Sequence, residues 1–201
     1  MIRPNRNFVL QEKVMKTAVI YSSQTGFTKR YANWIASAAH ADCLDVSAAS
    51  TEDLSQYDAI VFGSWISGGY LHDLHWLKDN LPTCPDQKRI LYIVGASPSE
   101  NEEVKRLRKK CLHAFEEHNV KDIFYCPGGF NLEKLPASSK AMMKLFIRTF
   151  LAKKSKTEPQ ALMARLIVKT YDVTNPKYIL PILDALKKTR MLKKNKPASL
   201  F

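Results

Sequence analysis

The stretch Lys16-Thr-Ala-Val-Ile-Tyr-Ser-Ser-Gln-Thr-Gly-Phe-Thr-Lys-Arg30 decides the fold of this chain. It begins with an apolar run of strand length, from Thr17 to Tyr21, passes through a hydroxyl-rich segment that ends at Gly26, and then takes up helical spacing. A turn of this kind leaves backbone N–H groups unpaired beside the positive end of a helix dipole, and phosphate is the ligand that suits such a site best. A plain strand-to-helix connection with a Ser/Thr cap fits the same residues, so the stretch alone leaves both interpretations open.

Further apolar runs of strand length follow in the chain, at 43–46, 58–63, 89–95 and 121–126. Helical spacing is found between them at 28–40, 71–80 and 102–118, and 51–56 is predicted to be a polar turn or a short helix. The longer strands are continuously apolar rather than alternating, which is typical of a parallel sheet covered on both faces. The predicted fold class is therefore α/β, with a five-stranded parallel sheet and helices on both faces.

Glycine is placed with a bias along this pattern. Each of the seven glycines falls at or just beyond the end of a predicted strand, and none falls in a predicted helix; they are Gly26, Gly63, Gly68, Gly69, Gly95, Gly128 and Gly129. In an open α/β sheet the carboxyl ends of the strands share one edge, and ligands bind there at the switch point of strand order. Turns that were only structural would place glycine at both edges, so the bias favours a site for phosphate and a flat ring.

Charge divides the chain into two parts. The net charge is +12, yet residues 136–201 hold 15 Lys/Arg against 3 Asp/Glu, whereas the remainder is balanced at 16 of each. The basic part predicts an anionic partner or surface that only this third of the chain meets. The basic segments lack the interleaved aromatic residues that stack on bases, so no nucleic acid partner is expected.

The sequence carries no sign of secretion or of membrane insertion. It has no run of about 18 apolar residues, and residues 1–14 have scattered charges and no apolar core, so they are interpreted as an extension ahead of the domain. The four cysteines are widely spaced, which indicates a reducing compartment, and Cys43 and Cys126 lie in apolar runs where buried thiols are expected. A cytoplasmic location is predicted, with peripheral attachment to the inner face of the membrane as the variant that the basic third suggests.

With these elements placed, the chain resembles the flavodoxin family. Ser23-Gln-Thr-Gly-Phe-Thr28 matches the phosphate-loop pattern (Ser/Thr)-x-Thr-Gly-x-Thr of that family, after the first strand and before the first helix. In the family this loop holds the terminal phosphate of FMN without a lysine or a metal, and a Walker-type P-loop is absent from the sequence. The resemblance implies FMN as the cofactor, with its phosphate held by Ser23, Gln24, Thr25, Gly26, Phe27 and Thr28.

The two ring-binding loops of the family follow the third and fourth strands. The resemblance therefore implies that the isoalloxazine lies between the loops 64–70 and 95–99, with Trp65 and Tyr70 either stacking on the ring or only packing on the domain. Gly68 and Gly69 would let a peptide turn its carbonyl toward flavin N5, through which the protein would tune the potential of the cofactor. The residues implied in these loops are Ser64, Trp65, Ile66, Ser67, Gly68, Gly69, Tyr70, Gly95, Ala96 and Ser97.

A narrower resemblance is to the flavodoxin-like, menaquinone-dependent protoporphyrinogen dehydrogenases. That group has a Gly-x-Ser-Ile-Arg-x-Gly-x-x-His run, which is matched here at Gly63, Ile66, Gly69 and His72. Trp65 and Ser67 depart from the pattern, which has Ser and Arg at these positions, so the substrate stays open. The role implied for His72 is delivery of protons to a reduced flavin or quinone. His72 and His75 also have a spacing that a metal could use, but no third ligand accompanies them, and no metal is predicted.

A basic, Met-rich segment after the fifth strand is similar to the insertion of that group. Between 138 and 154, Lys140, Lys144 and Arg148 recur every four positions, so they mark one face of a predicted helix whose remaining surface is largely apolar. Packing on the domain, covering a hydrophobic ligand and lying in a membrane interface are the three interpretations of such a helix.

These elements give the predicted organisation of the chain. An extension at 1–14 precedes a flavodoxin-like FMN-binding domain at 15–186, which contains the insertion at about 130–170, and a basic tail at 187–201 follows. Within the insertion a second helix is predicted at 159–169, and 174–186 looks like the closing helix of the fold, which Pro181 would kink unless it lies in the first turn or two. The basic helix and the tail together could hold the protein reversibly on an anionic membrane.

The leading functional hypothesis is an FMN-dependent oxidoreductase that passes electrons between a hydrophobic or anionic donor and a quinone-type acceptor. Its partners would be a redox protein or a small molecule of the quinone or porphyrinogen type. The first alternative is a soluble flavodoxin-type electron carrier, although such carriers are usually acidic and this chain is basic. The second alternative is a flavodoxin-like domain without flavin that serves as a basic interaction module.

Overall fold

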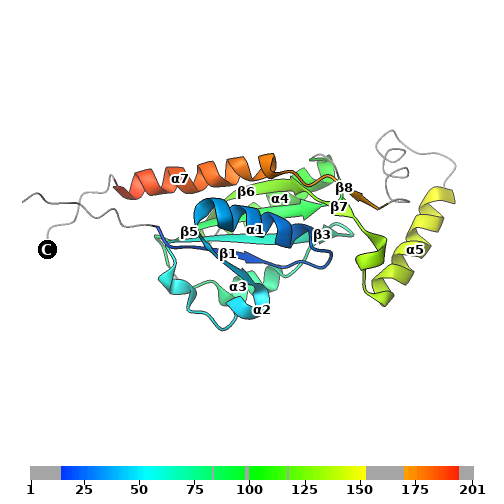
Figure 1. Ribbon diagram of the computed structural model, residues 1–201, viewed down its shortest axis with the longest axis horizontal. Helices are drawn as coiled ribbons and strands as arrows, with labels where there is room; N and C mark the ends of the chain where they lie inside the picture. The colour runs from blue at the N-terminus through cyan, green and yellow to red at the C-terminus, as the bar shows by residue number, and fades with distance from the viewer. Residues whose placement is uncertain (1–14, 83, 98–99, 117, 153–169, 195–201) are drawn as a thin grey trace, which may run out of the picture.

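In the computed structural model, residues 15–82, 84–97, 100–116, 118–152 and 170–194 are described. The central sheet has five parallel strands in the order β2-β1-β3-β5-β6 (Figure 1). Their bounds are β1 (Thr17–Tyr21), β2 (Asp42–Asp45), β3 (Ala59–Ser67), β5 (Lys88–Gly95) and β6 (Val120–Pro127). The chain passes from β1 to β2 on one side and then to β3 on the other side, so the strand order switches beside β1. The predicted fold class is confirmed.

Helices cover both faces of the sheet, as Figure 1 shows. On one face lie α1 (Phe27–Ala39), the short η3 (Pro176–Ile179) and α7 (Leu180–Lys194); on the other lie α2 (Val46–Ala49), η1 (Leu54–Gln56), α3 (Leu74–Asn80) and α4 (Glu102–Ala114). Each strand therefore has to be apolar on both sides. In β1, Ala18 and Ile20 join the core under α3 and α4, whereas Val19 and Tyr21 join the core under α1 and α7. Among the described residues, none of the helices is both long and apolar enough to cross a bilayer.

Several boundaries differ from those predicted. Helix α4 ends at Ala114 rather than at 118, because Phe115 caps it and the chain turns into β6. Pro181 is the second residue of α7, where a proline needs no backbone donor, so it produces no kink. Cys126 is buried as expected, but the expectation for Cys43 was wrong: β2 is an edge strand and this thiol is exposed. The closing helix was predicted at 174–186 and a basic tail at 187–201, but α7 continues to Lys194, so the first part of the predicted tail is helical. The predicted extension at 1–14, the predicted helix at 159–169 and the rest of the tail, 195–201, lie outside the described residues.

The largest difference is at residues 64–70, which were expected to form a loop. Strand β3 continues to Ser67 and folds back as β4 (Tyr70–Leu71), so Ile66 pairs with Leu71 and Ser67 with Tyr70. Gly68 and Gly69 have φ values of 58° and 79°, the combination that a two-residue hairpin turn requires. Helix α3 consequently begins at Leu74 instead of 71. The aromatic residues of this segment are thus carried by paired strands rather than by a free loop.

The insertion after β6 begins and ends in a small antiparallel ribbon. Its strands are β7 (Gly129–Phe130) and β8 (Tyr171–Asp172), paired directly across from one another. Between them come η2 (Leu132–Lys134) and the basic helix α5 (Ala137–Ala152), which confirms a helix close to the predicted range. Figure 1 shows α5 standing beyond the carboxyl ends of the strands, at the far end of the long axis from the last turn of α7.

Gly63, in the middle of β3, is needed because the ring of Tyr92 packs directly against it, a contact that the sequence did not predict. A Cβ atom at this position would lie 1.9 Å from the ring of Tyr92, which is fully buried on the neighbouring strand β5. The Tyr92 side chain lies over Gly63, and its hydroxyl donates a hydrogen bond of 3.1 Å to the carbonyl of Thr28 in α1. The glycine thus leaves the space in which a tyrosine ties the sheet to the first helix.

We expect Gly63→Ala to destabilise the domain by about 2 kcal/mol or more, because the added methyl group overpacks a core with no room to relax. The measurement is chemical denaturation of wild type, Gly63→Ala, Tyr92→Leu and the double variant. In the Tyr92→Leu background the Gly63→Ala change should cost less than half as much, since the clashing ring is gone. Equal costs in the two backgrounds would contradict this packing explanation.

Candidate functional site

The segment between β1 and α1 forms a turn that leaves donors at the start of the helix. The Ser22 N–H donates to the Gly63 carbonyl at 2.9 Å, which carries the β1–β3 pairing one residue past the strand. The Gly26 N–H donates to Ser23 Oγ at 3.2 Å, and the first helical bond runs from Arg30 N–H to the Gly26 carbonyl at 3.0 Å. The N–H groups of residues 27–29 therefore precede the first intrahelical bond, at the positive end of α1.

The start of α1 is not a Ser/Thr cap. The N-cap residue is Gly26, which makes no side-chain cap bond and has a φ of 93°, a conformation that L side chains rarely adopt. A Cβ atom there would meet nothing within 4 Å, so glycine serves the backbone conformation and the space beside it is open. Ser23, Gln24 and Thr25 of the same turn are half-buried, whereas Thr28 is only 1% exposed. The hydroxyls of Ser23 and Thr25 are the more accessible of the predicted donors.

Asp73 joins this turn from the next connection, and sequence reasoning missed it. The Ser22 hydroxyl donates a hydrogen bond to the Asp73 carboxylate, although the two residues are 51 positions apart. Asp73 stands directly before α3 and has a φ of 54°, so its backbone adopts the left-handed conformation that short polar residues tolerate best. A charge-assisted hydrogen bond of this kind is stronger than a neutral one. It fixes the end of the β3–β4 hairpin beside the first turn.

The hairpin carries the two aromatic residues in different ways. The indole of Trp65 is stacked on the imidazole of His72, with 3.6 Å between ring centroids and 4° between ring planes. The backbone N–H of His72 donates to the backbone carbonyl of Trp65 at 3.1 Å, and the Ser64 hydroxyl donates to the backbone carbonyl of His72. Tyr70, in contrast, is 77% exposed. One face of Trp65 is thus already covered, whereas Tyr70 presents a largely exposed ring.

Burial lowers the pKa of His72 below its ordinary value of 6.5, although the neighbouring Asp73 raises it in part. The predicted helical pair of His72 and His75 is not formed, because α3 begins at Leu74 and His72 lies ahead of it. His75 is an exposed residue of the helix. Among the described residues, no group of three or more metal-ligating side chains comes together.

The loop after β5 is held by two tyrosine hydroxyls. Tyr125 donates to the carbonyl of Ser97 at 2.7 Å, and Tyr171 donates to the carbonyl of Ala96. Burial raises the pKa of Tyr171 to about 12 and raises that of Tyr125 as well, so both hydroxyls keep their protons near neutral pH. Both bonds fix carbonyl groups of the predicted ring-binding loop, of which residues 98–99 lie outside the described range. Neither tyrosine was predicted, since their partners are backbone atoms.

The first turn of α1 also meets the base of the insertion. A Cβ atom at Gly129 would lie 2.7 Å from the ring of Phe27, and one at Gly128 would lie 3.4 Å from its Cβ atom. The Gly128 N–H donates to the Gly95 carbonyl at 2.8 Å. The two consecutive glycines therefore let the chain leave β6 in contact with both α1 and the loop after β5.

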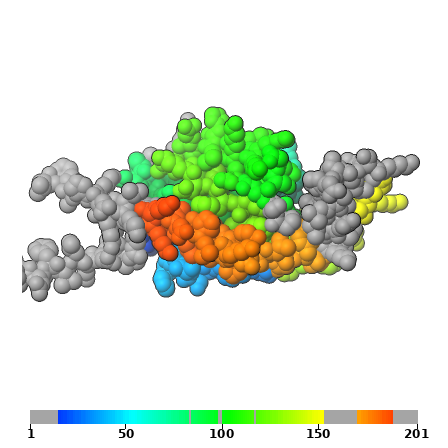
Figure 2. Space-filling view, turned by 90° about the horizontal axis from the view of Figure 1, so that it is seen from above, coloured from blue at the N-terminus to red at the C-terminus, as the bar shows by residue number. Residues whose placement is uncertain are grey.

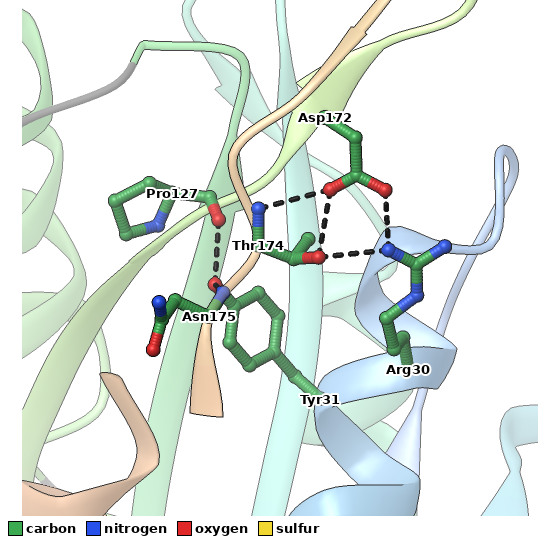
Figure 3. Close-up of polar contacts among 6 residues, drawn as sticks. All are labelled: Arg30, Tyr31, Pro127, Asp172, Thr174 and Asn175. Carbon is green, nitrogen blue, oxygen red and sulfur yellow. Dashed lines mark hydrogen bonds and ion pairs between the residues drawn. The ribbon is translucent and has the colours of Figure 1, made fainter. Parts of the chain in front are cut away.

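Polar contacts fasten the ribbon β7–β8 to α1, as Figure 3 shows. Arg30 of α1 is bound to the Asp172 carboxylate and donates to the Thr174 hydroxyl at 2.8 Å, while Asp172 also accepts from the Thr174 N–H at 2.9 Å. The neighbouring Tyr31 donates to the Pro127 carbonyl at 2.6 Å and accepts from the Asn175 N–H at 3.2 Å. One turn of α1 thereby holds both the end of β6 and the return of the insertion.

Comparison with known proteins identifies the family. The family model described as "Flavodoxin domain" matches residues 18–162, which is more than half of the chain. The chain belongs to the flavodoxin family. The match begins in β1 and includes the turn at 22–26, the hairpin, the loop after β5 and α5. No curated protein matches the sequence.

Solved structures of flavodoxins are also similar to this chain. Flavodoxin 1 from Bacillus cereus is 16% identical, with a TM-score of 0.44 over 76% of this chain and 97% of its own. Flavodoxin 2 from Bacillus cereus is 21% identical, with a TM-score of 0.44 over 56% of this chain and 84% of its own. The Megasphaera elsdenii flavodoxin is 18% identical, with a TM-score of 0.42 over 54% of this chain and 82% of its own.

The lowered pKa of His72 predicts a dependence of stability on pH. The unfolded chain binds a proton at His72 with a pKa of about 6.5, above that of the folded state, so the unfolded state gains more protons as the pH falls. The contribution of neutral His72 to stability is therefore complete above that value and is lost as the pH falls toward the folded pKa. Chemical denaturation at about pH 7.5 and about pH 5.5 measures the loss.

We expect His72→Gln to show a smaller loss of stability over this interval than the wild type, whereas His75→Gln, at an exposed position, keeps the wild-type loss. An NMR titration of the His72 imidazole should have its midpoint below 6.5. A midpoint at or above 6.5, or equal losses in the two variants, would contradict the interpretation.

Proposed function

We propose that the chain binds FMN at the carboxyl edge of its sheet and acts as a redox protein. The observation that carries the proposal is the convergence of three segments at that edge. The turn before α1 and the hairpin are joined through Ser22 and Asp73, and the loop after β5 is joined to the end of β6 through Gly95 and Gly128. The family to which the chain belongs supports the same cofactor.

The residues present fit a terminal phosphate at the first turn of α1. The space beside Gly26 is open, the hydroxyl-bearing residues Ser23 and Thr25 belong to the same turn, and the N–H groups of residues 27–29 lie at the positive helix end. The turn needs no lysine to bind a phosphate, because its backbone N–H groups and the dipole of α1 already favour an anion. Ser23 through Thr28 would hold this group, with Thr28 contributing mainly through its backbone because its side chain is buried.

The ring would lie between the hairpin and the loop at 95–97. Tyr70 supplies a largely exposed aromatic face, and the fixed loop after β5 leaves the backbone of Gly95, Ala96 and Ser97 to meet the polar edge of the ring. Gly68 and Gly69 give the turn a peptide that rotates at low cost, because neither residue carries a Cβ atom. FMN would supply the electron transfer, and these residues would bind and orient it.

For the partner reaction we propose an electron donor of hydrophobic or anionic character and a quinone-type acceptor, as in a protoporphyrinogen dehydrogenase. The support is the location of α5, an apolar and basic helix beyond the same edge. Near pH 7 the His72 imidazole is mainly neutral, which suits it to accept a proton from a donor and pass it on. The alternative of a soluble carrier is disfavoured by the net charge of +12.

Thr25→Ala is expected to weaken FMN binding at least about tenfold, the effect of losing about one hydrogen bond to a charged group. The measurement is a titration of the flavin-free protein with FMN, in which flavin fluorescence reports binding. Thr51→Ala is the matched control, because Thr51 is an exposed threonine of the α2 region that bonds the Ala48 carbonyl, and its affinity should equal that of wild type. An unchanged affinity in Thr25→Ala would place the phosphate elsewhere.

The redox reaction is tested with the FMN-loaded full chain. We expect oxidation of a porphyrinogen coupled to reduction of menaquinone, and His72→Gln should slow this oxidation at least about tenfold while FMN affinity stays within about twofold. Reduction by a ferredoxin-type donor without porphyrinogen oxidation would favour the electron carrier instead. If the purified protein is colourless and FMN does not reconstitute it, the oxidoreductase and the electron carrier are both excluded. The remaining hypothesis is then the flavin-free interaction module.

A further inference from the structure

Helix α5 exposes its apolar residues more than any other described helix. None of its 16 residues is buried, and the large side chains of Met142, Leu145 and Phe146 are 67%, 63% and 50% exposed. These three residues are spaced i, i+3, i+4, so they form one continuous stripe on the helix. Because water contact with such side chains is unfavourable, the stripe indicates a surface that is covered in the functional state.

The charges of α5 indicate what covers it. The helix carries Lys140, Lys144 and Arg148 and no acidic residue. Lys140 is paired with Glu133 of η2 at 2.9 Å, which ties the helix to its own base. Lys144 and Arg148 form no ion pair with any of the described residues, and both are exposed. Arg148 lies three positions after Leu145 and flanks the apolar stripe, and Lys144 lies one turn before Arg148. An apolar stripe on a helix that also exposes cations matches an anionic surface with an apolar interior.

The shape of the surface favours lipid over a folded partner. Figure 1 and Figure 2 place α5 at one end of the molecule, away from the last turn of α7 at the other end. Among the described residues α5 projects as one convex helix, and a fluid bilayer surface adapts to such a shape, whereas a protein partner would need a matching groove. Lysine and arginine can also extend along the apolar stripe and place their charges at the lipid phosphates.

We propose that α5 docks on an anionic membrane surface, with Met142, Leu145 and Phe146 inserted among the lipid chains and Lys144 and Arg148 bound to headgroup phosphates. The ribbon β7–β8 fixes the base of α5 to α1 through Arg30 and Asp172. Docking would therefore bring the carboxyl edge of the sheet next to the bilayer. The inference concerns lipid binding alone and holds whether or not the chain binds flavin.

The experiment is sedimentation of the full chain with vesicles, either of equal parts phosphatidylglycerol and phosphatidylcholine or of phosphatidylcholine alone. We expect binding at least about tenfold tighter to the anionic vesicles. Lys144→Gln with Arg148→Gln should weaken that binding at least about tenfold. The matched control is Lys109→Gln with Lys110→Gln, which removes the same charge from exposed positions of α4 and should leave binding within about twofold of wild type.

The apolar stripe is tested separately with Leu145→Gln and Phe146→Gln, which keep good helix formers at exposed positions. This double variant should also lose at least about tenfold in affinity for anionic vesicles. Circular dichroism and the denaturation midpoint confirm that each variant is folded. Failure of the wild type to bind anionic vesicles, equal binding to both vesicle types, or an equal loss in the α4 control would overturn the proposal. Self-association that the Leu145→Gln/Phe146→Gln variant abolishes, without vesicle binding, would assign the stripe to a second copy.

Discussion

The parallel pairing of β1 with β3 is the contact on which the site depends. Tyr21 is level with Gly63, and the Ser22 N–H extends the ladder to the Gly63 carbonyl. This register places the turn before α1 next to the base of the hairpin. The Ser22 hydroxyl can therefore donate its hydrogen bond to the Asp73 carboxylate. A shift by one residue would turn the apolar side chains of β1 to the opposite faces and would separate these two segments.

Four tyrosine hydroxyls form hydrogen bonds that connect the segments around that edge of the sheet. Tyr31, Tyr92, Tyr125 and Tyr171 each donate to a backbone carbonyl, and burial raises the pKa of each of them. They link α1 to β6, β5 to α1, and β6 and β8 to the loop after β5. The loop after β5, which lies beyond the last strand pairing at Gly95, is thereby held in place by side chains anchored in the core, and a neutral donor stays available across the physiological pH range.

The fold could be predicted from the sequence because each strand is buried on both faces and therefore reads as a continuous apolar run, as in Thr17–Tyr21. The turn at Ser23–Thr28 could be located because its pattern lies between a strand and a helix. The hairpin could not, since Trp65, Ile66 and Ser67 have no simple alternation and the pairing depends on the φ values of Gly68 and Gly69. Asp73 and the tyrosines also escaped prediction, because their partners are 51 to 96 positions away or are backbone atoms.

The ribbon of β7 and β8 has a consequence for how the chain could vary among related proteins. Phe130 and Tyr171 are direct neighbours across the ribbon, so both ends of the 40-residue excursion between them leave the domain at one point. A descendant that lost the excursion would need only a tight turn to close the hairpin, while the pairings of the five parallel strands stayed as they are. The excursion is thus a module that can be exchanged, and the surface that a protein of this architecture presents to its surroundings can change without any change in its sheet.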